Sequence, residues 1–286
     1  MLRIILLLLS CDALLLRREC EELTKLPVFV LNLQRRSDRL SKLSHFLSKK
    51  APWLLQRSCR VEAPDGSRLN ESGDVLGLAT EAMAQAAIER SHSGTQSLVL
   101  YMTQGALALI FGHGRIWEHI LQQDFPYAIV MEDDISELHP GLGSFLCDAM
   151  KGNVSWDLIQ LQHWRPGKEN RGLESQFQPS KPLELKPGTG YNTGMYMITK
   201  EAASKMLDYQ FPLGFAGKTL QIDHDNSPLR SKLKGFHSEG RAASQSSEDT
   251  DVQIVSLLQA NETLIEDCPP LDPSQMKLAE LQKVLS

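Results

Sequence analysis

The chain has 286 residues, of which 42% are hydrophobic and 23% are charged, and its formal net charge is -5 at pH 7. This is ordinary globular composition, with enough apolar residues for a sizeable core in one large domain or two small ones. The acidic balance gives no electrostatic reason to expect a nucleic acid as partner, and the sequence shows no repeat at solenoid periods and no heptad run.

The N-terminal segment differs from the rest of the sequence. Arg3 precedes a strongly apolar stretch that Asp12 interrupts, and Arg17 and Arg18 follow it. The stretch is too short for a stable membrane span and suits the apolar region of a secretory signal. We therefore predict a signal peptide over residues 1–22 and a location in the secretory pathway, in the ER or Golgi lumen. A buried N-terminal helix is the alternative, since no small-x-small cleavage site follows.

The sequence contains five cysteines, none of them spaced as in a metal knuckle: Cys11, Cys20, Cys59, Cys147 and Cys268. Two of them lie in or beside the signal, so the other three allow one disulfide and one free thiol. Asn-x-Ser/Thr sequons occur at Asn70, Asn153 and Asn261. They support N-glycosylation only together with entry into a luminal compartment.

Strands and helices alternate along the chain. The predicted elements, in order, are a strand at 26–33, a helix within 34–50, a strand at 59–66 that ends in a Pro-Asp-Gly turn, helices at 74–90 and 101–123, strands at 127–131, 156–162 and 191–198, a helix at 199–209 with Thr199 as N-cap, and a helix within 271–285 that starts at Asp272-Pro273. The polar stretches 164–190 and 225–250 are expected to be loops. This alternation predicts an α/β sandwich with a mostly parallel sheet, in which ligands bind beyond the carboxyl ends of strands.

Three acids, Glu132, Asp133 and Asp134, directly follow the apolar run 128–131. One interpretation is a solvated turn in which an Asp caps the next helix. The other is a divalent-metal site, since a hard cation neutralises carboxylates that would otherwise repel each other, and oxygen ligands suit Mg²⁺ or Mn²⁺. Alternate residues of an extended chain point the same way, so Glu132 and Asp134 are expected to share a face while Asp133 faces the other side.

A basic segment follows the first predicted strand. Asn32 closes that strand, and Arg35, Arg36 and Arg39 come within the next two turns. Their guanidinium groups suit a phosphate or diphosphate, and a solvated helix start explains each of them equally simply.

Two further segments contain groups able to do chemistry. His113 lies between two glycines, as a hydrogen-bonded core residue or as a group directed at a site. Asp223, next to His224, suits a general base or a metal ligand, and a turn explains it as well.

These segments, in this order, resemble the motifs of glycosyltransferase family 25. The matching segments are "VFVLNLQRRSDRL", "LALIFGHGRIWEHIL", "YAIVMEDDI", "WDLIQL", "YNTGMYMITKEAASKML" and "QIDHDN", within residues 27–258. The family contains bacterial lipooligosaccharide glycosyltransferases and procollagen galactosyltransferases. The resemblance implies a GT-A fold, which is a nucleotide-sugar-binding α/β sandwich. It also implies transfer of a sugar from a nucleotide donor, often UDP-galactose, with Mn²⁺ and inversion at the anomeric carbon.

Carried over position by position, the resemblance implies roles for single residues. The acidic triplet matches the family's DxD-like motif, so Glu132 and Asp134 would hold Mn²⁺ (or Mg²⁺) and, through it, the donor diphosphate, with Asp133 assisting. The other donor-binding candidates are Asn32, Arg36, Arg39 and His113, and the candidate catalytic base is Asp223. The chain departs from the family pattern at Gly112, where Ser is usual, at Ala108-Leu109, where Gly-Cys is usual, and at Gln221-Ile222 in a Pro-Val-Asp-like segment.

We therefore predict a metal-dependent glycosyltransferase domain at residues 25–262, followed by a helical tail at 263–286. Its partners would be a nucleotide-sugar donor, with galactose as the expected sugar, and a hydroxyl acceptor on a glycan or protein. The substitutions around His113 keep open a non-catalytic glycan- or protein-binding pseudoenzyme of the same fold. A nucleotidyltransferase-like enzyme would also place acids at a strand end, whereas the Rossmann and P-loop fingerprints are absent from the sequence.

Overall fold

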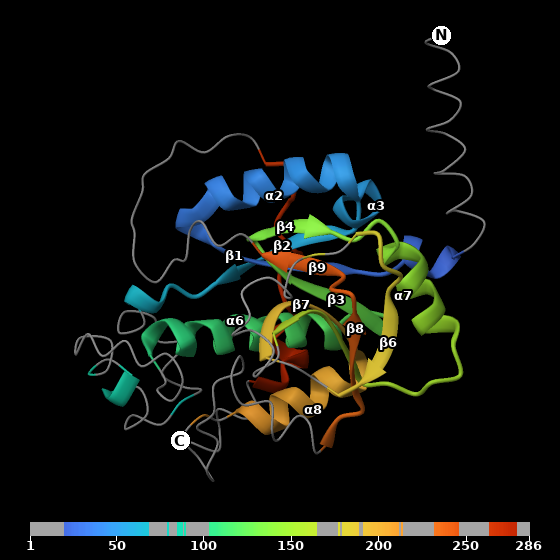
Figure 1. Ribbon diagram of the computed structural model, residues 1–286. Helices are drawn as coiled ribbons and strands as arrows, with labels where there is room; N and C mark the ends of the chain where they lie inside the picture. The colour runs from blue at the N-terminus through green and yellow to red at the C-terminus, as the bar shows by residue number, and fades with distance from the viewer. Residues whose placement is uncertain are drawn as a thin grey trace.

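The computed structural model has a seven-stranded central sheet with helices on both faces (Figure 1). It describes residues 20–68, 79, 85–87, 89, 103–164, 177, 179–188, 191–211, 213, 232–245 and 263–278. In spatial order the strands are β2 (Ser58–Ala63), β1 (Val28–Leu33), β3 (Tyr127–Glu132), β7 (Tyr191–Thr199), β5 (Leu158–Trp164), β8 (Gly235–Glu239) and β6 (Glu184–Pro187).

Most strands of this sheet run in one direction. β2, β1 and β3 are parallel neighbours, and β5 and β8 are parallel to each other. β7 runs antiparallel between β3 and β5, and β6 runs antiparallel to β8 at the edge. Only β7 and β6 therefore oppose the other strands of the sheet. The predicted α/β class with a mostly parallel sheet is confirmed, and the arrangement is consistent with a GT-A-like fold.

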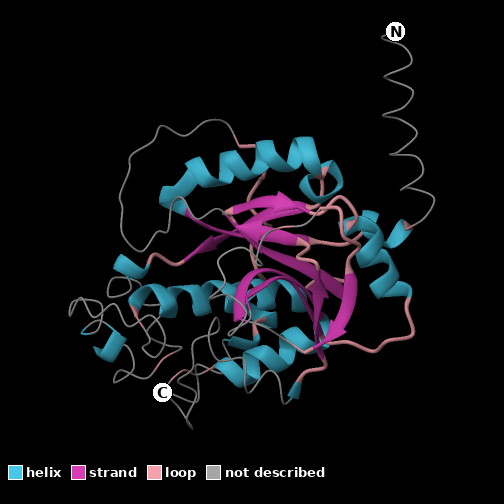
Figure 2. Cartoon of the chain, in the orientation of Figure 1, coloured by secondary structure: helices cyan, strands magenta, loops and turns pink. Residues whose placement is uncertain are grey.

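Two layers of helices cover the sheet (Figure 2). α2 (Ser37–Lys50), α3 (Pro52–Leu55) and α7 (Leu142–Lys151) pack on one face, whereas α6 (Gln104–Leu121) and α8 (Lys200–Gln210) pack on the other. The side chains of β3 alternate between these layers: Ala128 and Val130 contact the α6 layer, and Ile129 and Met131 contact the α2 layer. Burial on both faces explains why this strand is a continuous apolar run. None of the helices in the described ranges is both long and apolar enough to cross a membrane.

A second, two-stranded sheet lies beside the end of β3. It pairs β4 (Ile135–Leu138) with β9 (Ala243–Gln245) in antiparallel orientation, and Ile135 is the partner of Gln245. The remaining short elements are the 3-10 turns η1 (Glu21–Thr24), η2 (Gln34–Arg36), η3 (Gly66–Arg68) and η5 (Pro273–Gln275). This small sheet brings a segment from late in the chain next to the three acids.

The strongly apolar elements were predicted well. The strands at 26–33, 127–131 and 191–198 and the helices at 101–123 and 199–209 are confirmed, and the Thr199 hydroxyl accepts a hydrogen bond from the Ala202 N–H as a helix cap. The loop predictions for 164–190 and 225–250 are wrong where they contain β6, β8 and β9, and β4 and α7 were not predicted. The missed strands are short and half exposed, so they lack a clear alternation of apolar and polar residues.

Two predicted helices fall largely outside the described residues. Within 74–90, residues 85–87 and 89 are helical. In the tail, Asp272 accepts a hydrogen bond from the Ser274 N–H as expected of an N-cap, and the turn that it begins is 3-10. The continuation of the tail beyond residue 278 lies outside the described range.

Two disulfides join distant parts of the chain. Cys20 pairs with Cys147 in α7, and Cys59 in β2 pairs with Cys268 in the C-terminal segment. The expectation of a single disulfide with one free thiol is therefore wrong, because Cys20 belongs to the folded chain and is only 2% exposed. Cleavage after residue 22 would remove half of the first disulfide.

Candidate active site

The three acids lie where the carboxyl ends of β1 and β3 meet. These strands are parallel neighbours, with Leu31 opposite Glu132, so Asn32 at the end of β1 lies beside the acids that follow β3. The amide nitrogen of Asn32 donates to Asp133 Oδ2 at 2.7 Å. The sheet topology therefore brings together groups that are about a hundred residues apart in the sequence.

Glu132 and Asp134 converge on one point. The side-chain nitrogen of Gln245, in β9, lies 3.2 Å from Glu132 Oε2 and 2.9 Å from Asp134 Oδ1. Glu132 also accepts a hydrogen bond from the Thr193 hydroxyl at 2.9 Å. Gln245 is thus a common partner of Glu132 and Asp134, although residues 133 and 134 lie in a turn and not in the extended strand on which the prediction of a shared face rested.

Asp133 is directed toward the N-terminal motif. It is 8% exposed and contacts Asn32 and Arg39. Arg39 bridges two of the acids, because its Nε lies 3.1 Å from Asp133 Oδ1 and its Nη2 lies 2.6 Å from Asp134 Oδ2. One guanidinium group thus fixes the relative position of two neighbouring carboxylates.

The other arginines support this arrangement from a distance. Arg36 is buried and forms two parallel contacts with Asp38, at 2.9 and 3.1 Å. Its backbone carbonyl accepts a hydrogen bond from the Asn32 amide. Arg60, from β2, donates from Nε to Asn32 Oδ1 at 3.0 Å. Asn32 is therefore held on both ends of its side-chain amide, and it in turn holds Asp133.

His113 is fully buried, and it faces the site. Its Nδ1 lies 2.9 Å from the Tyr196 hydroxyl, and its Nε2 lies 3.8 Å from Glu132 Oε1. The Trp117 indole can only donate, so the Tyr196 oxygen accepts from it at 3.0 Å and the Tyr196 hydroxyl hydrogen is directed to His113 Nδ1. This arrangement favours the His113 tautomer with its proton on Nε2, toward Glu132.

The glycines beside His113 have a packing role. A Cβ on Gly112 would lie 2.8 Å from a methyl carbon of Leu31, and one on Gly114 would lie 2.7 Å from the ring of Phe211. Both glycines are therefore needed because a neighbouring side chain packs directly against the helix backbone at each position. At position 112, where the family usually has Ser, the Leu31 side chain occupies the space that a serine side chain would need.

The electrostatic environment raises the pKa of both acids that contact Gln245. Burial, and after it the charge of Asp134, raises the pKa of Glu132 to about 7. Burial also raises the pKa of Asp134, and the nearby Arg39 opposes that shift. Because charging both groups costs free energy in this environment, a cation placed between them would be stabilising.

The donor set fits a magnesium or manganese ion that shares its ligands with a substrate. Within the part of the chain that the structure describes, no group of three or more His, Cys, Asp or Glu side chains is arranged as a metal cage. Mg²⁺ is commonly held by one or two carboxylates together with substrate phosphates and water, and it needs no full protein cage. Glu132 and Asp134 are two such carboxylates on one face.

The structure brings together most of the residues singled out from the sequence. Glu132, Asp133, Asp134, Asn32 and Arg39 form one network, and His113 borders it, whereas Arg36 contributes its backbone oxygen and pairs its side chain with Asp38. Asp223 lies outside the described residues. The side chains that the sequence analysis did not identify are Arg60, Tyr196, Thr193 and Gln245. Thr193 and Tyr196 lie in a recognised segment, while no sequence signal marks Arg60 or Gln245.

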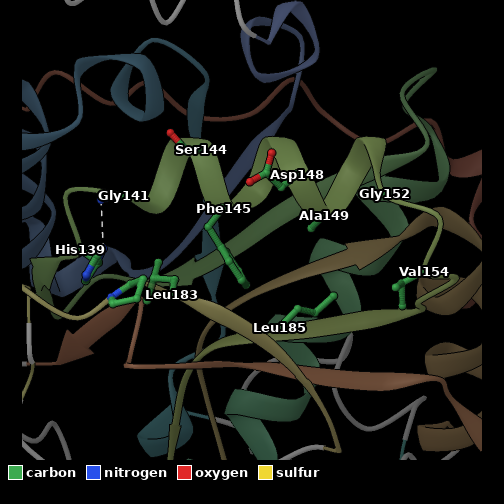
Figure 3. Close-up of a pocket in the computed structure, with 11 residues that line it drawn as sticks. His139, Gly141, Ser144, Phe145, Asp148, Ala149, Gly152, Val154, Leu183 and Leu185 are labelled. Atoms are coloured by element: carbon green, nitrogen blue, oxygen red, sulfur yellow. Dashed lines mark hydrogen bonds between the residues drawn. The ribbon is translucent and has the colours of Figure 1, made fainter.

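A separate pocket of about 380 Å³ lies between α7 and the edge strand β6 (Figure 3). Most of its lining is apolar, with Phe145, Val154, Leu183 and Leu185 among the contributing side chains. His139 closes one end, where its Nδ1 accepts a hydrogen bond from the Gly141 N–H. The pocket shares no lining residue with the acidic network.

Comparison with known proteins places these motifs in a family. Residues 25–224 match the model described as glycosyltransferase family 25 (LPS biosynthesis protein). Procollagen galactosyltransferase 1 of Danio rerio is 26% identical over 190 residues, which cover 63% of this chain and 28% of the relative. A glycosyltransferase 25 family member of Anopheles gambiae is 29% identical over 227 residues, which cover 76% of this chain and 34% of the relative. The chain spans about a third of the length of these curated relatives. Since the family model matches well over half of its residues, the chain belongs to glycosyltransferase family 25.

Proposed function

We propose that this chain is a metal-dependent glycosyltransferase domain that moves a sugar from a UDP-sugar to a hydroxyl acceptor on a glycan or protein. The observation that carries the proposal is the convergence of Glu132 and Asp134 on one point at the carboxyl end of β3. In α/β sheets this end is where ligands bind. Membership of family 25 supplies the reaction class.

Galactose is the proposed sugar, and inversion at the anomeric carbon is the proposed stereochemistry. The relative from Danio rerio is named a procollagen galactosyltransferase, which supports galactose and a protein acceptor. That name also supports a location in the secretory pathway. The two disulfides agree with it, because disulfides persist in oxidising compartments.

The chain's own residues would divide the work as follows. Glu132 and Asp134 would hold Mn²⁺ or Mg²⁺, with Arg39 and Asn32 fixing the neighbouring Asp133. When bound, the cation would supply positive charge to stabilise the leaving diphosphate. Asp223 is the proposed base that takes the proton of the acceptor hydroxyl, on the strength of the sequence resemblance.

A pseudoenzyme of the same fold is the second candidate, because Gly112 departs from the family's Ser. The structure gives Gly112 a packing explanation, and the buried contacts of His113 with Tyr196 and Glu132 are in place beside it. These observations favour an active enzyme.

The experiment is a calorimetric titration of UDP-galactose with and without Mn²⁺, followed by an assay of UDP release with candidate acceptors. We expect Mn²⁺-dependent binding, which Asp134→Ala abolishes without loss of fold. Asp148→Ala removes an equal charge from the exposed face of α7 and should leave binding unchanged. Mn²⁺-dependent binding without any turnover would identify the pseudoenzyme. Unchanged donor affinity in Asp134→Ala would contradict the site assignment.

A further inference from the structure

Gln245 occupies the position between the two carboxylates of the site. Its side-chain nitrogen carries two hydrogens, and these are directed to Glu132 Oε2 at 3.2 Å and to Asp134 Oδ1 at 2.9 Å. Its side-chain oxygen accepts from the amide nitrogens of Gln162 at 3.1 Å and Asn192 at 2.9 Å. The orientation of this amide is determined by its neighbours, since the reverse orientation would place its oxygen against two carboxylates.

The surroundings of Gln245 are built to hold its amide there. A Cβ on Gly194 would lie 2.6 Å from the Gln245 nitrogen, so only glycine leaves room for the amide above β7. Asn192 adopts a backbone φ of 87°, a left-handed conformation that is uncommon outside glycine. In this conformation its side chain both donates to Gln245 and accepts from the Gly194 N–H. Three strands, β5, β7 and β9, therefore cooperate to place one neutral donor.

The chemistry of that donor explains its position. Glu132 and Asp134 are largely buried and repel each other, and the charge of Arg39, which contacts Asp134 at 2.6 Å, only partly offsets this repulsion. An amide NH₂ group satisfies one oxygen of each carboxylate without adding a charge. A divalent cation binds oxygen ligands and not an NH₂ group, so the cation and the amide compete for the same two oxygens.

We propose that Gln245 is the positioning residue of the Glu132–Asp134 pair: its amide holds the two carboxylates toward one point in the cation-free protein and gives way when a divalent cation binds. This inference rests on the proposed function, in which that cation is Mn²⁺ or Mg²⁺. The new element is that the cation must displace the Gln245 amide from the two carboxylates. This displacement lowers the affinity of the site for the cation.

The test compares Gln245→Glu with Gln122→Glu. Gln122 is a charge-matched control, because its side-chain amide also makes a donor and an acceptor contact, at 3.2 and 2.9 Å, with the backbone of Asp272. Gln245→Glu replaces the competing donor with a third carboxylate. We expect its Mn²⁺ affinity, measured by calorimetry without nucleotide, to rise by about tenfold, since ligand charge tunes the affinity of such sites. Gln245→Met removes the donor without adding charge, and its affinity should move the same way by a smaller factor.

A second readout does not depend on the cation. In a chelating buffer, Gln245→Glu should unfold at a lower urea concentration than Gln122→Glu, because three carboxylates then meet in one place. Equal Mn²⁺ affinity of Gln245→Glu and Gln122→Glu, or weaker binding in both Gln245 variants, would overturn the inference. If the unmodified protein binds no Mn²⁺ even in the presence of UDP-galactose, the cation of the proposed function is wrong. The positioning role is then decided by the chelator comparison alone, where equal stability of the two Glu variants rejects it.

Discussion

Replacing Arg39 with Met tests whether one guanidinium group holds the acidic network together. Arg39 contacts Asp133 at 3.1 Å and Asp134 at 2.6 Å, and its side chain is only 10% exposed. Removing one partner of a buried ion pair leaves uncompensated charge and typically costs about 3–5 kcal/mol. We therefore expect Arg39→Met to lose about 3 kcal/mol of unfolding free energy near neutral pH.

The same helix region offers a matched control. Arg35 pairs with Asp65 at 2.9 Å, and its side chain is 36% exposed. An exposed pair of this kind contributes about 0.2–1 kcal/mol, so Arg35→Met should cost at most about 1 kcal/mol. Urea denaturation followed by circular dichroism measures both losses. If Arg39→Met costs no more than Arg35→Met, then the guanidinium of Arg39 does not compensate buried charge and the electrostatic reasoning for this site fails.

Three further predictions concern the rest of the molecule. Gly114→Ala should lose about 1–3 kcal/mol because its Cβ would meet the ring of Phe211, whereas Gly105→Ala, on the exposed start of α6, should be neutral or stabilising; thermal unfolding compares them. Burial lowers the pKa of His119 from 6.5 to about 4, so the unfolded chain takes up this proton first. Its contribution to stability is therefore full above pH 6.5 and is lost as the pH falls toward 4. A neutral replacement such as His119→Gln should flatten that part of the stability profile. Asn153, in the exposed segment after α7, should carry an N-glycan in a eukaryotic secretory host if the proposed luminal location is right; mass spectrometry of Asn153→Gln should show the loss of one glycan, and an unmodified Asn153 would count against that proposal.

How far the site could be predicted depended on how local its signals are. The acids stand directly after a buried strand, and Asn32 closes another, so strand ends alone placed them at one edge of a parallel sheet. Gln245 belongs to a strand of three residues, which is too short for a periodic pattern, and it reaches the acids only through pairing with β4. That pairing is a contact between segments about a hundred residues apart, and the local sequence does not predict it.

The role of the basic residues was harder to anticipate for a similar reason. Arg36 and Arg39 are three residues apart in the same motif, yet Arg36 pairs with Asp38 two positions along, while Arg39 reaches the acids after β3. Composition and spacing make the two equivalent. Only the packing of α2 against the ends of β1 and β3 distinguishes a supporting arginine from one that contacts the site.

The disulfide between Cys59 and Cys268 has a consequence for the order in which the protein matures. Its two cysteines are 209 positions apart, so Cys59 remains a thiol during synthesis until Cys268 has been made. During that time Cys20 and Cys147 are available to form a non-native disulfide with Cys59. The C-terminal segment that finally arrives also brings Asp267, which contacts Arg60 Nη1 at 2.9 Å, and Arg60 in turn donates to Asn32. One side of the acidic network is therefore completed only after residues 267 and 268 have left the ribosome. Maturation should accordingly depend on a thiol–disulfide isomerase that corrects early mispairing of Cys59.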